Sequence, residues 1–142
     1  MLHLVHPAIV HFAVAFIVVG ASLEAYAYLR SHESLLRWAA PLLVVGTVSL
    51  IAVIFSGYLA ANSIEVDPAA METLKSHERN GWILLALVVL AQFWKAWHGG
   101  RIEGVQRKLY AAWLLLIVVC ALYGALLGGE LVYQWGVGVG EG

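Results

Sequence analysis

Four long apolar stretches constrain the fold more than any other feature of this sequence. Each holds about the twenty apolar residues that a helix needs to cross the hydrocarbon core of a bilayer. The composition agrees, since 62% of the 142 residues are hydrophobic and only 12% are charged. We therefore predict an integral membrane protein, an all-α bundle of four transmembrane helices that forms one domain over residues 1–142. The predicted spans are Pro7 to Leu29, Trp38 to Ala61, Gly81 to Trp97 and Leu109 to Gly128.

The basic residues are distributed unevenly between the two sides of this predicted bundle. Six of the eight lie at the link between the first two spans or at the link between the last two. By the positive-inside rule this side is cytoplasmic, so both termini are expected on the outer, periplasmic side of a bacterial inner membrane. The net charge of −1 gives no reason to expect a nucleic acid partner. The six residues are Arg30, Arg37, Lys95, Arg101, Arg107 and Lys108.

Two polar residues inside the spans are interpreted as structural. The single Cys120 excludes a disulfide within the chain and a cysteine metal cluster. Glu24 lies near the cytoplasmic end of the first span, where its carboxylate is expected to reach water or Arg30. No internal repeat of useful length is recognised in the sequence.

Proline residues mark the expected starts of two helices. Pro7 is suited to the first position of a helix, where its missing N–H would have no partner, so the first helix is expected to start there. Asp67 and Pro68 form the same kind of signal, an N-cap followed by proline. The helix begun at Pro68 is expected to run through His77 into the third span and to protrude from the membrane.

Histidines from separate parts of the sequence converge on the outer side in this topology. His3, His6 and His11 lie at the N-terminus, His77 opens the third span, and Glu130 follows the fourth. Ionisable groups near the end of a membrane span are candidates for function. We read His3 as an interfacial residue, and the remaining four as the candidate site.

Two of these histidines have small neighbours at helical spacing. Ala8 and Ala15 flank His11, and Gly81 follows His77 by one turn. A flat helix surface beside an imidazole suits a haem ligand, because the porphyrin must lie close to the backbone. We therefore predict one b-type haem near the outer face, with His11 and His77 as axial ligands. Two imidazole ligands leave no open iron position, which favours electron transfer over oxygen chemistry.

Three alternatives stay open. His6 lies five residues before His11, so the two side chains point about 140° apart on a regular helix and cannot both be directed at one iron; His6 is expected to support the site, with a ligand role as the alternative. Copper, zinc or non-haem iron could instead be bound directly by His6, His11, His77 and Glu130. The chain could also be a cofactor-free assembly subunit of a respiratory complex.

Several motifs of the chain resemble the bacterial membrane proteins grouped as "domain of unknown function 2231". They are His6-Pro7-x-x-x-His11-Phe12, the lone His77, Gly128-Gly129-Glu130-Leu131-Val132-Tyr133 and Gly136-Val137-Gly138-Val139. The resemblance covers nearly the whole chain. It implies electron transfer, because relatives of this kind look as if they are fused to Rieske or c-type cytochrome modules.

This resemblance also suggests partners and shows two departures. The expected redox partner is a c-type cytochrome, a Rieske protein or a quinone, and a homodimer is a further expectation. Ala13 stands where the family usually has proline, and Trp135 stands where it often has histidine. The second departure weakens the case for a ligand in the C-terminal tail.

Overall fold

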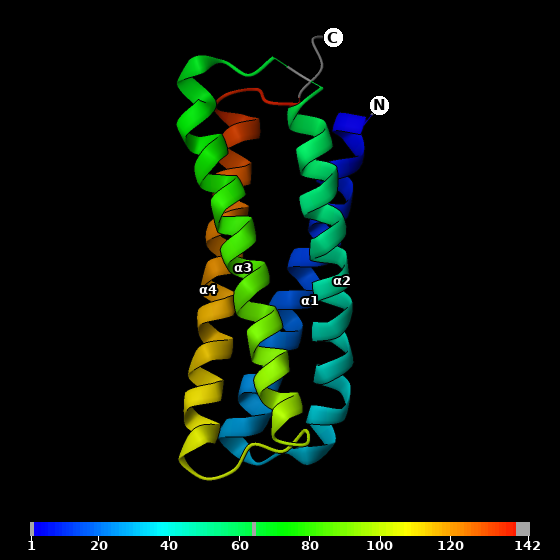
Figure 1. The fold of residues 1–142 in the computed structure, drawn as a ribbon, viewed down its shortest axis with the longest axis vertical. Coiled ribbons are helices and arrows are strands. Elements are labelled where there is room, and N and C mark those ends of the chain that lie inside the picture. The colour runs from blue at the N-terminus through cyan, green and yellow to red at the C-terminus, as the bar shows by residue number, and fades with distance from the viewer. Residues whose placement is uncertain (1, 64, 139–142) are drawn as a thin grey trace.

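The computed structural model is a bundle of long helices (Figure 1). It describes the backbone of residues 2–63 and 65–138, and the side chains from residue 6 onward, again without residue 64. This described part contains four α-helices, one short 3-10 helix and no strand. All four α-helices are long and apolar enough to cross a membrane, which confirms the predicted fold class. The elements are α1 (Leu2–Arg30), α2 (Glu33–Ala61), η1 (Pro68–Ala70), α3 (Met71–Trp97) and α4 (Val105–Tyr133).

The structure shows where the two helices expected to start at proline residues begin. The prediction for Asp67 is confirmed, because its side chain accepts a hydrogen bond of 2.8 Å from the Ala69 N–H and η1 leads directly into α3. The expected start at Pro7 is wrong. Helix α1 begins at Leu2 and contains Pro7, so His6 lies inside the first helix rather than before it.

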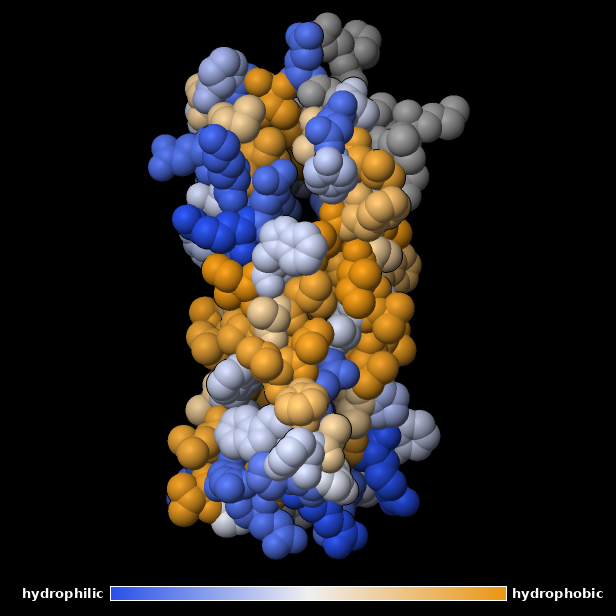
Figure 2. Space-filling view, viewed as in Figure 1, coloured by the Kyte–Doolittle hydropathy of each residue, from blue (hydrophilic) through white to orange (hydrophobic). Residues whose placement is uncertain are grey.

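The helices run alternately up and down. Helix α1 packs against α2 and α4, and α3 packs against the same two helices, so α1 and α3 lie diagonally across the bundle axis. We call the end that carries the α1–α2 and α3–α4 links the hairpin end, and the opposite end the termini end. Figure 1 shows that the two hairpins lie farther apart at the termini end. The surface is apolar around the middle and polar at both ends, as expected for a membrane-spanning bundle (Figure 2).

Two glycines allow α1 and α2 to approach closely. A Cβ at Gly20 would lie 2.8 Å from the Leu43 backbone nitrogen, and a Cβ at Gly46 would lie 2.9 Å from the Ile17 backbone nitrogen. These neighbours are backbone atoms, so a Cβ at either glycine would push the two helices apart. Small residues thus let these two helices pack backbone against backbone, as is common where lipid surrounds a bundle.

Several buried residues of the first hairpin have a buried counterpart 71 residues later in the second hairpin. The residue types mostly differ, but both members of these pairs are buried. The buried pairs include Ala13 with Leu84, Ile17 with Val88, Leu43 with Leu114, and Leu50 with Ala121.

Candidate functional site

The imidazole of His6 is held between α1 and α2 at the termini end. Its Nδ1 lies 3.0 Å from the hydroxyl oxygen of Ser56. The ring packs on Gly57, where a Cβ would lie 2.8 Å from the His6 Cε1 atom. Ser56 and Gly57, two small residues at the termini end of α2, thus position this imidazole, although neither was among the residues expected to form the site.

The imidazole of His77 is held in the same way between α3 and α4. Its Nδ1 lies 3.1 Å from the Gly124 carbonyl oxygen. A Cβ at Gly128 would lie 3.2 Å from the His77 Cε1 atom, so only glycine fits here without moving the ring. The His77 ring therefore lies against Gly124 and Gly128 of α4.

The hydrogen bonds determine where each ring carries its proton. The Ser56 hydroxyl has a single hydrogen and donates it to the Val53 carbonyl at 2.9 Å, so it must accept from His6 Nδ1. The Gly124 carbonyl can only accept, so Nδ1 of His77 is also the donor. Both neutral imidazoles consequently carry their proton on Nδ1 and leave the Nε2 lone pair free.

His6 and His77 occupy corresponding positions of the two hairpins. His77 follows His6 by 71 residues, and Gly128 follows Gly57 by the same interval. Each histidine comes from the first helix of its hairpin and packs on a glycine of the second. The two rings lie on helices that are diagonal in the bundle, both at its termini end. Each hairpin thus presents one imidazole whose Nδ1 is hydrogen-bonded within that hairpin.

His11 does not join this pair. It is exposed, as are Ala8 and Ala15, and its Nδ1 lies 2.6 Å from the Pro7 carbonyl oxygen. The expected pairing of His11 with His77 across the bundle interior is therefore not formed. The reason is helix rotation, since five residues turn an α-helix through about 500° and His6 takes the inward direction.

Gly81 and Glu130 have other neighbours than expected. Gly81 faces α2, and a Cβ there would meet only Ile54, at 3.8 Å. The carboxylate of Glu130 accepts hydrogen bonds from the Thr73 hydroxyl at 3.0 Å and from Trp135 Nε1 at 3.5 Å. Glu130 thus ties α3 and the C-terminal segment to α4.

The donor atoms do not form a cluster for direct metal binding. Within the described part of the chain, no group of three His, Cys, Asp or Glu side chains could hold a metal ion. The set of His6, His11, His77 and Glu130 is not gathered at one point. The side chain of His3 lies outside the described residues.

A second polar site lies at the hairpin end. The buried Glu24 carboxylate forms an ion pair of 2.6 Å with Lys95 and accepts a hydrogen bond of 3.2 Å from the Tyr110 hydroxyl. The expected partner, Arg30, is not its ion-pair partner. Lys95 also follows Glu24 by 71 residues, so this pair occupies equivalent positions of the two hairpins.

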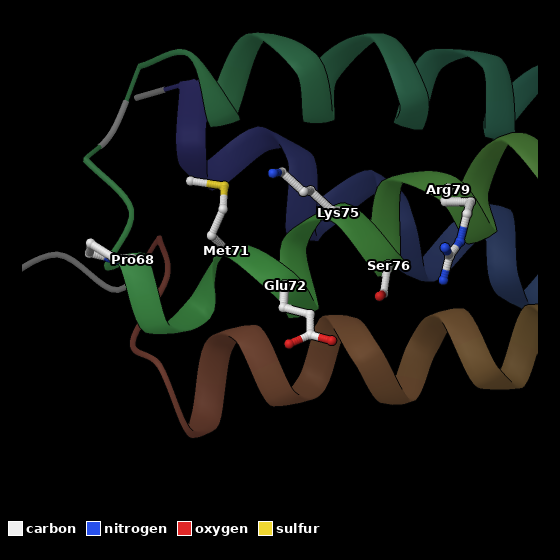
Figure 3. A pocket seen from close by; sticks show the side chains of 6 residues that line it. All are labelled: Pro68, Met71, Glu72, Lys75, Ser76 and Arg79. Carbon is white, nitrogen blue, oxygen red and sulfur yellow. The ribbon is translucent and has the colours of Figure 1, made fainter.

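An open recess on α3 is separate from both polar sites. Its lining includes Glu72, Lys75 and Arg79, whose side chains are exposed (Figure 3). In Figure 3, Glu72 extends towards α4 and Lys75 extends towards the other hairpin. Neither the His6 nor the His77 imidazole lines this recess, so the candidate site remains the histidine pair.

Comparison with known proteins places the chain in one family. A family model described as "predicted membrane protein (DUF2231)" matches residues 2–141. The chain belongs to this family, which confirms the resemblance seen in the sequence. No curated protein and no solved structure matches the chain.

Proposed function

We propose that this DUF2231 membrane protein is a b-type cytochrome that holds one haem between His6 and His77 and transfers electrons. One observation carries the proposal: each hairpin presents a histidine with its proton on Nδ1 and its Nε2 lone pair free. A metal-bound histidine commonly donates its other N–H to a fixed acceptor, which sets the tautomer and orientation of the ring. His6 replaces His11 as the proposed partner of His77.

The donor set fits haem better than a directly bound ion. A zinc ion takes at least three protein ligands, and the described residues gather no such group here. Haem needs only two axial ligands from the protein, because the porphyrin supplies the other four. Bound haem would supply reversible one-electron transfer. The bis-histidine set favours this role because it leaves no coordination position for a substrate.

The surrounding residues of this chain would orient and support the two ligands. Ser56 and the Gly124 carbonyl direct the Nδ1–H groups, so the Nε2 atoms are left for the iron. Gly57 and Gly128 let the rings lie against the neighbouring helices.

The proposed location follows from the charge distribution. We place the termini end, and with it the histidine pair, on the periplasmic side of a bacterial inner membrane, because most basic residues lie at the hairpin end. The electron donor or acceptor would be a c-type cytochrome, a Rieske protein or a quinone able to reach that side.

An absorption spectrum of the purified protein, expressed with ample haem supply, tests the proposal. We expect a Soret band and the spectrum of six-coordinate, low-spin haem. His6→Ala and His77→Ala should each give high-spin haem or abolish binding, because one strong ligand is lost. His11→Ala is the matched control and should keep the low-spin spectrum, since His11 lies on the outward face.

Two results would contradict the proposal. A protein without a Soret band is not a cytochrome, and elemental analysis would then separate a directly bound metal from a cofactor-free assembly subunit. Loss of haem in His11→Ala, with retention in His6→Ala, would place the ligand on the outward face. There it could be shared only with a second molecule, such as another copy of the chain.

A further inference from the structure

Asn80 is a polar side chain buried between α3 and α4, about one turn after His77. It is 7% exposed, and it lies within the part of α3 that is long and apolar enough to cross a membrane. Polar residues inside a membrane span are costly and are usually kept for function or for a partner. Its place beside a proposed haem ligand makes Asn80 a candidate for a role in the histidine site.

The amide of Asn80 forms two hydrogen bonds with one residue of α4. Its Nδ2 donates to the Cys120 carbonyl oxygen at 3.1 Å, and its Oδ1 accepts from the Cys120 thiol at 3.3 Å. A carbonyl oxygen has two lone pairs, so that of Cys120 can accept from Asn80 and still accept within its own helix. Hydrogen bonds in both directions fix the orientation of the amide and tie α3 to one position along α4.

Gly124 brings this amide and the His77 imidazole to the same stretch of α4. Its carbonyl oxygen lies 3.1 Å from His77 Nδ1 and accepts that proton. A Cβ at Gly124 would lie 2.5 Å from Asn80 Nδ2, so the amide occupies the space where a side chain would be. His77 and Asn80 are therefore bonded to two carbonyls that are one turn apart on α4, those of Gly124 and Cys120.

These contacts together determine the register of α3 against α4. His77 and Asn80 are three residues apart, about 4.5 Å along α3, and their two acceptors are four residues apart, about 6 Å along the antiparallel α4. Sliding α3 by a residue would break the bonds of Asn80, and an amide without partners is costly where lipid excludes water. Asn80 thus keeps the Gly124 carbonyl in line with the His77 Nδ1–H group.

We propose that Asn80 is a positioning residue for His77. It holds α3 on α4 so that the Gly124 carbonyl accepts the Nδ1–H of the imidazole and Nε2 is left for the iron. The consequence for haem rests on the proposed cytochrome function, whereas the consequence for the imidazole does not. An acceptor on the second ring nitrogen makes a histidine a stronger ligand. Through His77, Asn80 would therefore also lower the reduction potential of bound haem.

Nitrogen NMR of the full chain, labelled with ¹⁵N-histidine in detergent and free of haem, tests the proposal. Wild-type protein should carry the His77 proton on Nδ1. Asn80→Leu keeps the branching of the side chain and removes its hydrogen bonds, so it should give a mixture of the two tautomers. Gly124→Ala should do the same, because its methyl group would meet the Asn80 amide and no atom of His77. The second variant thus reaches the imidazole through Asn80.

Gln92 supplies the matched control on the same helix. Its Nε2 donates to the Thr47 hydroxyl of α2, so it also forms a hydrogen bond between helices. It follows His77 by 15 residues, about 22 Å along α3. Gln92→Met removes this bond and should leave the His77 proton on Nδ1. The comparison separates the positioning of His77 from a general loss of stability.

The outcomes decide between these roles. An Nδ1 proton kept in folded Asn80→Leu and Gly124→Ala would overturn the proposal, and so would the same tautomer mixture in Gln92→Met. A change in Gly124→Ala but not in Asn80→Leu would also overturn it, since the methyl group would then act without the amide.

Haem-loaded protein provides a second measurement. Asn80→Leu should raise the reduction potential and weaken haem binding about tenfold, as is typical when an outer partner of a ligand is lost, while the low-spin spectrum is kept. An unchanged potential and affinity would contradict the role of Asn80 in the haem site. Wild-type protein that binds no haem would instead contradict the cytochrome function, and the tautomer of His77 would still test Asn80.

Discussion

Glu24 and Lys95 form a 2.6 Å ion pair across the bundle axis, from equivalent positions of the two hairpins. Glu24 is 1% exposed and the Lys95 side chain is 17% exposed. Tyr28 and Tyr110 pack edge to face beside the pair, with ring centroids 5.1 Å apart. The hairpin end is thus closed by charge and aromatic packing, whereas the histidine pair lies where the hairpins diverge.

Removing one member of this ion pair should destabilise the protein more than removing both. Lys95→Met leaves the Glu24 carboxylate buried and unpaired, which costs about 3–5 kcal/mol in typical proteins. The double variant Glu24→Gln/Lys95→Met should recover most of that loss, because no buried charge remains. Thermal unfolding in detergent would measure the stability of the single and the double variant. A double variant as unstable as Lys95→Met would show that the pair itself, and not the uncompensated charge, holds the hairpins together.

The spans could be predicted from the sequence because their signals are local. Hydropathy defines each helix within its own residues, and Asp67 with Pro68 marks a helix start within two residues. The start of α1 was missed because Pro7 was read as the first helical residue, although the helix contains it. Pro7 is the sixth residue of α1, beyond the first turn, where proline is usually avoided, so the sequence signal pointed to a later start.

The sequence offered His6, His11 and His77 as candidate site residues without showing how they lie. Whether His6 or His11 points into the bundle depends on which face of α1 packs inward, which is a property of the folded structure. A signal existed: His6 lies seven residues before the buried Ala13, which is close to two helical turns and hence on the same face. The sequence could not assign Gly57 and Gly128 to the imidazoles. Each glycine lies on a different helix from the histidine that it contacts, so only the packing of the helices brings them together.

A methyl group at Gly20 should separate α1 from α2. Its Cβ would lie 2.8 Å from the Leu43 nitrogen, a backbone atom that cannot rotate away. Gly20→Ala should therefore lower the free energy of unfolding by about 1–3 kcal/mol, the usual cost of overpacking. Gly129→Ala is the control, since its Cβ would meet only Tyr133, at 3.9 Å. Equal melting temperatures for the two variants would contradict the close approach of α1 and α2.

Ser56→Ala should disturb the proposed haem site without removing a ligand. It deletes the acceptor for His6 Nδ1–H, which sets the tautomer of that ring. Loss of such an outer partner typically reduces metal affinity about 10- to 100-fold. Haem titration should show this weakening while the low-spin spectrum is kept. Ser63→Ala, at an exposed position just after α2, should bind haem as the wild type does.

Reporter fusions can determine the orientation in the membrane. A reporter inserted between Asn62 and Asn80 should be active outside, and one near Gly100 should be active in the cytoplasm. Both expectations rest on the excess of basic residues at the hairpin end. The opposite pattern would turn the histidine pair towards the cytoplasm and remove the argument for a periplasmic redox partner.

Alanine at the two ring-contacting glycines should affect haem binding unequally. At Gly57 the new Cβ would lie 2.8 Å from His6 Cε1, closer than real Cβ contacts, so the imidazole must move. At Gly128 the distance to His77 Cε1 would be 3.2 Å, which a small shift of the ring relieves. We therefore expect Gly57→Ala to reduce haem content per folded protein more than Gly128→Ala does. Gly81→Ala is the matched control, because its Cβ meets only Ile54, at ordinary contact distance. If haem content falls in Gly81→Ala but not in Gly57→Ala, His6 is not a ligand, and the porphyrin lies along α3 without it.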